Sequence, residues 1–114
     1  MYKTKEFADL TGLTKETLRY YAEIGLLEPA FVNPKNHYRY YDDGSYFLAV
    51  LLVKLKNLGF TIQEMHLAMQ DESFGRLESL MKEKRAVIQT QIEALQNQQR
   101  GIDEFLKSGQ GEDT

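Results

Sequence analysis

Residues 4–21 read TKEFADLTGLTKETLRYY, and this stretch decides the fold. Thr4 can cap the start of a first helix, and Gly12 can end that helix in a left-handed conformation. The small Ala8, the turn at Gly12 and the apolar Leu18 have the spacing that two steeply crossed helices require. The spacing predicts a helix-turn-helix, although a plain helical hairpin with a charged outer face would also satisfy it.

The second helix of the pair presents charge on the side away from the first helix. Thr14 can cap this helix and Gly25 can end it. Lys15 and Arg19 are four residues apart, so their side chains point the same way. They are candidates for contacts with an anionic partner.

A β-hairpin is predicted to follow between residues 31 and 41. Phe31-Val32 and Tyr38-Arg39-Tyr40-Tyr41 are β-prone, and the turn Asn33-Pro34-Lys35-Asn36 separates them. Because side chains alternate along a strand, we expect Arg39 on the face opposite Tyr38. We expect Arg39, Lys35 and His37 to approach phosphates and Tyr41 to be buried, while the alternative is that the tyrosines serve packing alone.

Two more short helices complete the first part of the chain. Asp42 can cap a third helix that runs to Leu58, with Gly59 just beyond its end. Thr61 and Glu64 have capping-box spacing, which predicts a fourth helix to about Met69. The first domain is therefore expected over residues 1–70, where eight basic and eight acidic side chains balance.

A long helix is predicted over residues 71–107, followed by a flexible tail at 108–114. Apolar residues recur along it with heptad spacing, which is typical of a coiled coil. Such a rod is roughly 50 Å long at 1.5 Å per residue, whereas a 70-residue globule is only about 28 Å across. We expect the seam to pack on a second copy of the chain, with a helix bent back at Gly75 or Gly101 as the alternative. The seam residues are Phe74, Leu77, Met81, Ile88, Leu95, Ile102 and Phe105.

The composition excludes several kinds of protein. The 114 residues include no cysteine and only two histidines, which excludes thiolate metal sites and disulfide scaffolds. The longest apolar run has seven residues and the first residues carry no apolar segment, so neither a membrane span nor a signal peptide is expected. Paired acids such as Asp42-Asp43 are explained by helix capping rather than catalysis. These observations favour a cytoplasmic protein that is no enzyme and needs no metal or cofactor.

Four linked motifs resemble the MerR family of bacterial transcription regulators. They are Leu18-Arg19-Tyr20-Tyr21, Gly25-Leu26-Leu27-x-Pro29, Tyr38-Arg39-Tyr40-Tyr41 and Leu58-Gly59-Phe60-Thr61-Ile62-x-Glu64. Their order and spacing agree with the family over about residues 2–70. The resemblance implies a mainly α fold: a winged helix-turn-helix with a small hairpin wing, then a long, antiparallel coiled-coil dimerisation helix.

The resemblance also implies a function. Such proteins bind palindromic promoter DNA as homodimers, distort the promoter spacer, and act on RNA polymerase indirectly through the promoter. The family's DNA contacts carry over to residues of the second helix, the wing and the third helix. These are Lys15, Thr17, Arg19, Tyr20, Tyr38, Arg39 and Lys56.

The chain departs from the family's sensing branches. It lacks the cysteines of the metal sensors, and few residues follow the long helix where the multidrug-binding branch has an effector domain. It is therefore expected to be either a minimal regulator or a piece of a longer one. The alternative from another functional class is a protein-interaction module that does not bind DNA and uses the coiled coil to hold a different protein.

Overall fold

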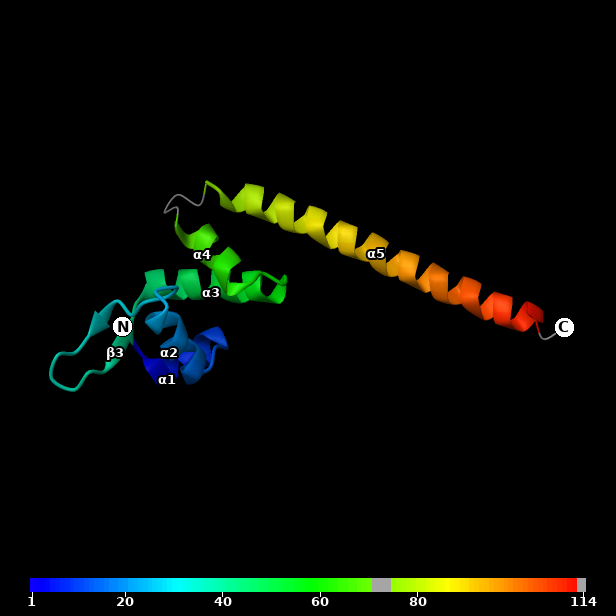
Figure 1. Cartoon of the computed structure of the whole chain (residues 1–114). Coiled ribbons are helices and arrows are strands. Elements are labelled where there is room, and N and C mark those ends of the chain that lie inside the picture. Colours follow the sequence, from blue (N-terminus) through cyan, green and yellow to red (C-terminus); the bar gives the residue numbers. More distant parts are fainter. Residues whose placement is uncertain (71–74, 113–114) are drawn as a thin grey trace. The chain divides into compact units, whose positions relative to one another are not determined.

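The computed structural model describes residues 1–70 and 75–112 and divides the chain into two units, residues 1–74 and 75–114. We call them the N-terminal unit and the C-terminal unit. The first contains a three-stranded sheet and four helices, and the second contains one long helix (Figure 1). The mainly α architecture and the order of the helices agree with the prediction.

Helices α1 (Thr4–Thr11) and α2 (Lys15–Glu23) form the predicted helix-turn-helix. Gly12 ends α1 with φ of 80°, and its N–H donates to the Ala8 carbonyl at 2.9 Å. The Thr14 hydroxyl caps α2 by accepting from the Thr17 N–H at 3.0 Å. We predicted that Thr4 caps α1, and this is wrong. Thr4 is the first residue of α1 and Lys3 is the N-cap residue, because strand β1 leads directly into the helix.

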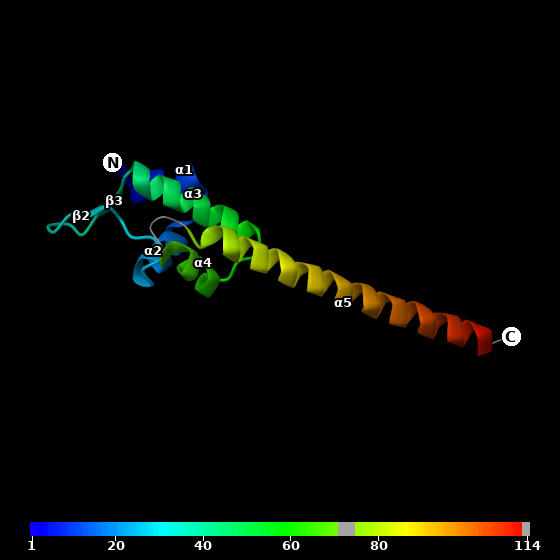
Figure 2. The same ribbon diagram turned by 90° about the horizontal axis from the view of Figure 1, so that it is seen from above.

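The sheet has one strand more than the predicted hairpin. Strand β3 (Arg39–Tyr41) pairs antiparallel with β2 (Phe31–Val32) and also with β1 (Tyr2–Lys3). A two-residue strand is too short to show the alternation by which strands are recognised in a sequence. In both views the β2–β3 hairpin projects from the helices as a wing (Figures 1 and 2).

Helices α3 (Asp43–Asn57) and α4 (Ile62–Gln70) begin at the caps that the sequence predicts. The Asp42 carboxylate accepts from the Ser45 N–H at 2.8 Å, and this hydrogen bond holds the pKa of Asp42 below its usual range. Thr61 and Glu64 form the reciprocal bonds of a capping box, at 2.9 and 3.1 Å. The core of the N-terminal unit centres on the fully buried Phe7, Leu18, Tyr41, Leu52, Leu55 and Met65.

Helix α5 (Leu77–Glu112) has 36 residues and differs from the prediction at both ends. Gly75, a residue with poor helix propensity, and Arg76 lie in a turn before the helix. The Arg76 carbonyl accepts from the Leu80 N–H at the start of α5. The helix also continues through residues 108–112, which we assigned to the tail, because each of the two glycines there costs only about 1 kcal/mol and no proline intervenes. The predicted seam residue Phe74 lies outside the described residues.

None of the helices in residues 1–70 and 75–112 is long and apolar enough to cross a membrane. Neither do these residues contain a cluster of three or more acidic or histidine side chains that could hold a metal ion.

Candidate nucleic-acid interface

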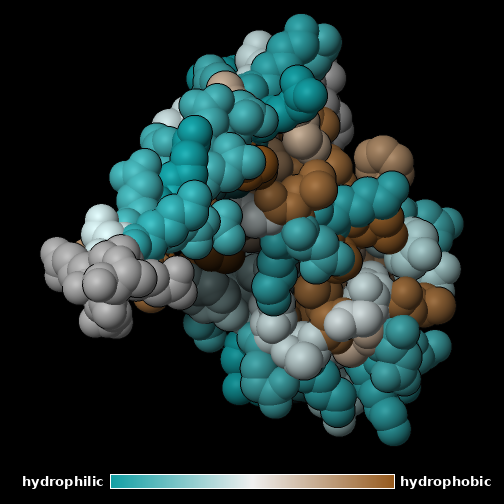
Figure 3. Space-filling view, turned by 90° about the vertical axis from the view of Figure 1, so that its right-hand side faces the viewer, coloured by the Kyte–Doolittle hydropathy of each residue, from teal (hydrophilic) through white to brown (hydrophobic). Residues whose placement is uncertain are grey.

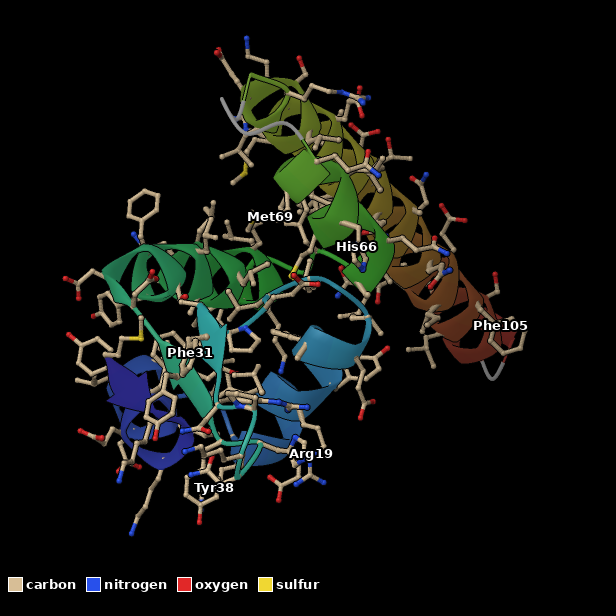
Figure 4. All side chains as sticks on the ribbon, turned by 90° about the vertical axis from the view of Figure 1, so that its left-hand side faces the viewer. Arg19, Phe31, Tyr38, His66, Met69 and Phe105 are labelled. Atoms are coloured by element: carbon tan, nitrogen blue, oxygen red, sulfur yellow. The ribbon has the colours of Figure 1, made fainter. Side chains whose placement is uncertain are left out.

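A groove of about 570 Å³ lies between α2, the wing and the N-terminal segment. It brings together five of the residues predicted to bind DNA, which come from two separate stretches of sequence. Figure 4 shows Arg19 of α2 and Tyr38 of the wing at the same edge of the N-terminal unit. The residues that line the groove are Lys3, Thr4, Lys5, Lys15, Arg19, His37, Tyr38 and Arg39.

The wing is shaped by two asparagines at its turn. The Asn33 side chain accepts from the Lys35 N–H at 2.9 Å, and the Asn36 side chain accepts from the Tyr38 N–H at 2.9 Å. His37 has φ of 62°, a left-handed conformation that histidine adopts more readily than most residues. These bonds hold the chain so that His37, Tyr38 and Arg39 all face the groove.

Tyr38 and Arg39 both line the groove, whereas alternation along a strand predicts that their side chains point to opposite faces. Strand β3 begins at Arg39, so Tyr38 belongs to the turn and the two-residue period does not apply to it. The prediction that Tyr41 is buried is confirmed, since none of its surface is exposed.

The groove is strongly basic although the N-terminal unit as a whole is not. Five lysines and arginines line it, and no acidic side chain does. Within residues 1–70 and 75–112, none of these five side chains forms an ion pair. A concave surface with several unpaired cations attracts anions such as the phosphates of a nucleic-acid backbone.

The remaining predicted DNA-binding residues lie elsewhere. Thr17, Tyr20 and Lys56 line a depression of about 320 Å³ together with residues that begin α4. Lys35 is exposed at the turn of the wing and lines neither hollow. Helix α2 thus separates two groups of candidates, one shared with the wing and one shared with α3 and α4.

Lys3 and Lys5 belong to the groove but were not predicted. Their place depends on β1, whose pairing with β3 joins residues about forty positions apart. Two lysines flanking the start of the first helix were the only signal in the sequence, and a solvated helix end gives the same pattern.

Helix α5 exposes apolar side chains along its length. Every residue from Arg85 to Gly109 is exposed. The face of the molecule seen in Figure 3 carries hydrophilic side chains with hydrophobic ones among them. Of the predicted seam, Leu95, Ile102 and Phe105 are 60%, 61% and 79% exposed, and Ile88 is 38% exposed. Leu77 and Met81 are half-buried. Ile92 and Leu106, each four residues after a predicted seam residue, are exposed as well.

Comparison with known proteins connects this geometry to a family. A family model described as MerR HTH family regulatory protein matches residues 2–72. The multidrug-efflux transporter 1 regulator of Bacillus subtilis is 33% identical over 94 residues, which is 82% of this chain and 34% of that protein. The chain thus spans about a third of the length of the curated relatives that head the comparison.

Two solved structures resemble most or nearly all of the chain. One is the EcmrR–DNA complex in EcmrR-RPo, which is 32% identical with a TM-score of 0.78, covering 99% of this chain and 41% of that one. The other is HiNmlR, a MerR family regulator lacking the sensor domain, bound to promoter DNA. It is 26% identical with a TM-score of 0.59, covering 84% of this chain and 76% of that one.

Proposed function

Because the chain belongs to the MerR family of helix-turn-helix regulatory proteins, we propose that it regulates transcription as a homodimer bound to palindromic promoter DNA. In this proposal the dimer distorts the spacer of the promoter, and RNA polymerase responds to the changed DNA. The protein then works in the cytoplasm, where the promoter is. The family is one of regulators rather than enzymes.

The observation that carries the proposal is the basic groove between α2 and the wing. Residues 1–70 have no net charge, yet five unpaired cations gather on one concave surface. Lys15 and Arg19 lie on α2, which would enter the major groove, and Arg39 lies on the wing beside it. In this arrangement α2 reads bases while the wing holds phosphates.

Helix α5 supports a second copy of the chain as the partner. A helix that exposes several large apolar side chains along one line is stabilised by burying them against another helix. Leu77–Gln91 carries three basic and two acidic residues, whereas Ile92–Glu112 carries two basic and four acidic. An antiparallel pair places the positive half of one helix against the negative half of the other. A parallel pair would instead place Lys84, which holds the heptad position three residues after Met81, beside Lys84 of the second copy.

The proposal is tested by binding to the DNA upstream of the protein's own gene, measured by fluorescence anisotropy over a series of salt concentrations. Arg39→Ala should weaken binding to this duplex and to a scrambled one equally, and should flatten the salt dependence by about one charge. Arg19→Ala should cost roughly 1–3 kcal/mol of binding free energy on the upstream duplex if the Arg19 guanidinium makes a bidentate contact with a base. It should also relax discrimination at one base-pair position.

The opposite results have definite meanings. Unchanged affinity in Arg39→Ala would remove the wing from the mechanism, and an equal loss on all sequences in Arg19→Ala would make that residue a phosphate contact. A protein that binds neither duplex at low salt would support the interaction module without DNA binding.

A further inference from the structure

We propose that the N-terminal segment Lys3–Lys5 is a third DNA-contacting element, in which Lys3 and Lys5 each bind a backbone phosphate in the groove beside the wing. This inference rests on the proposed function. It assigns a role to residues outside α2 and the hairpin, in β1 and the first turn of α1.

The segment is held in place by the fold and is not a loose arm. Lys3 belongs to β1 and pairs with Tyr40 of β3, next to the wing residue Arg39. The Tyr2 hydroxyl donates to the Asp43 carboxylate at 3.1 Å, and the Lys3 N–H donates to the Glu6 carboxylate at 3.3 Å. These contacts fix the backbone on both sides of Lys3, so its position relative to the wing is set before any ligand arrives.

The lining of the groove defines the ligand. Its volume falls within the range of small-molecule sites, but five of its eight lining residues are lysines or arginines, and none is acidic or aliphatic. Lys3 and Lys5 contribute two of its five lysines and arginines, and the Thr4 side chain adds a hydrogen-bond donor. The chemistry fits a phosphate group.

The position of the groove favours the phosphodiester of DNA over free phosphate. It opens between the predicted recognition helix and the wing, where a DNA backbone must pass if both elements contact the same duplex. Lysine is a flexible point charge and binds phosphate without distinguishing bases. The two lysines should therefore raise affinity for all duplexes alike.

The test compares Lys3→Ala, Lys5→Ala and the double variant on the upstream duplex and on a scrambled duplex. Each phosphate contact contributes about 0.9 to the slope of log K against log salt. The double variant should lower that slope by roughly two, and each lysine should be worth roughly fivefold in affinity at 0.15 M salt, extrapolating from 1 M. Lys54→Ala is the matched control, because Lys54 is an exposed lysine of α3 that lines neither hollow.

Circular dichroism and a urea melt establish that each variant is folded. If Lys3→Ala disturbs the sheet, the comparison uses Lys5→Gln instead, because Lys5 lies in α1 and outside the sheet. An unchanged salt slope in folded variants, with Arg39→Ala still impaired, would overturn this inference and leave the proposed function intact. Binding of inorganic phosphate that the double variant loses, while its affinity for both duplexes is unchanged, would also overturn it, in favour of a free-phosphate site. A parent protein that binds no duplex would overturn both proposals.

Discussion

The buried side-chain hydroxyl of Tyr41 lacks a hydrogen-bond partner among the described residues. The ring is stacked on Phe7, with centroids 4.3 Å apart and planes 7° from parallel. Its hydroxyl oxygen is buried and has no hydrogen-bond partner within residues 1–70 and 75–112. Burial raises the pKa of Tyr41 above its ordinary value near 10, and the nearby Arg39 opposes this shift only in part.

Tyr41→Phe should therefore stabilise the N-terminal unit, by about 1 kcal/mol, because it removes an unsatisfied polar group and keeps the stacked ring. The change should also alter the response to alkali. A raised pKa in the folded state means that the contribution of Tyr41 is complete below pH 10 and is lost as the pH rises through the folded value. Urea melts at pH 7 and above pH 10 should show a smaller alkaline loss in the variant.

Some alkaline loss should remain in Tyr41→Phe, because burial raises the pKa of Tyr21 as well. A less stable variant at pH 7 would show that the Tyr41 hydroxyl has a hydrogen-bond partner, such as a bound water.

At the scale of secondary-structure elements, replacing glycine by alanine should have opposite effects on stability at two positions. Gly12 ends α1 with φ of 80°, while Gly101 lies inside α5, and an added Cβ would meet no atom within 4 Å at either site. Gly12→Ala should destabilise the N-terminal unit by about 1–2 kcal/mol through backbone strain alone. Gly101→Ala should stabilise α5 by about 1 kcal/mol through helix propensity. Thermal melts followed by circular dichroism measure both.

Each variant is the control for the other, since the added methyl group is identical. Destabilisation by Gly101→Ala would mean that the backbone of a partner helix lies against Gly101. An unaffected Gly12→Ala would mean that the turn accommodates a side chain by changing its conformation.

Helix ends show how far the sequence predicts these elements. The caps Thr14, Asp42 and Thr61 were identified because each satisfies helix N–H groups within three residues. Strand β1 and the groove lysines were not, because they depend on a pairing between residues 2–3 and 40–41. The C-terminal end of α5 was misplaced because glycine is only a weak helix breaker.

For the whole molecule, the proposed function depends on α5 although none of its residues should touch DNA. One N-terminal unit has a single recognition helix, and joining two units makes the second DNA contact effectively intramolecular. Ile88→Asp places a carboxylate in the middle of the apolar seam and should split the dimer, because an unpaired charge is costly to bury. Sedimentation measures the oligomeric state, and anisotropy should show loss of most of the affinity for the upstream duplex.

Glu83→Asp is a suitable control, since it keeps the charge of an exposed residue outside the predicted seam. The N-terminal unit should remain folded in Ile88→Asp. A stable Ile88→Asp dimer, or a monomer that binds DNA as tightly as the parent, would falsify this dependence on α5.

The pairing of β1 with β3 also has a consequence for the folding kinetics. It closes a loop of about forty residues that contains α1, α2 and the wing. Contacts between distant residues require loop closure before they stabilise anything, whereas helices α1 and α2 meet through a short turn. We therefore expect the base of the wing to close last during refolding, so that the rate of folding is set by a strand of only two residues.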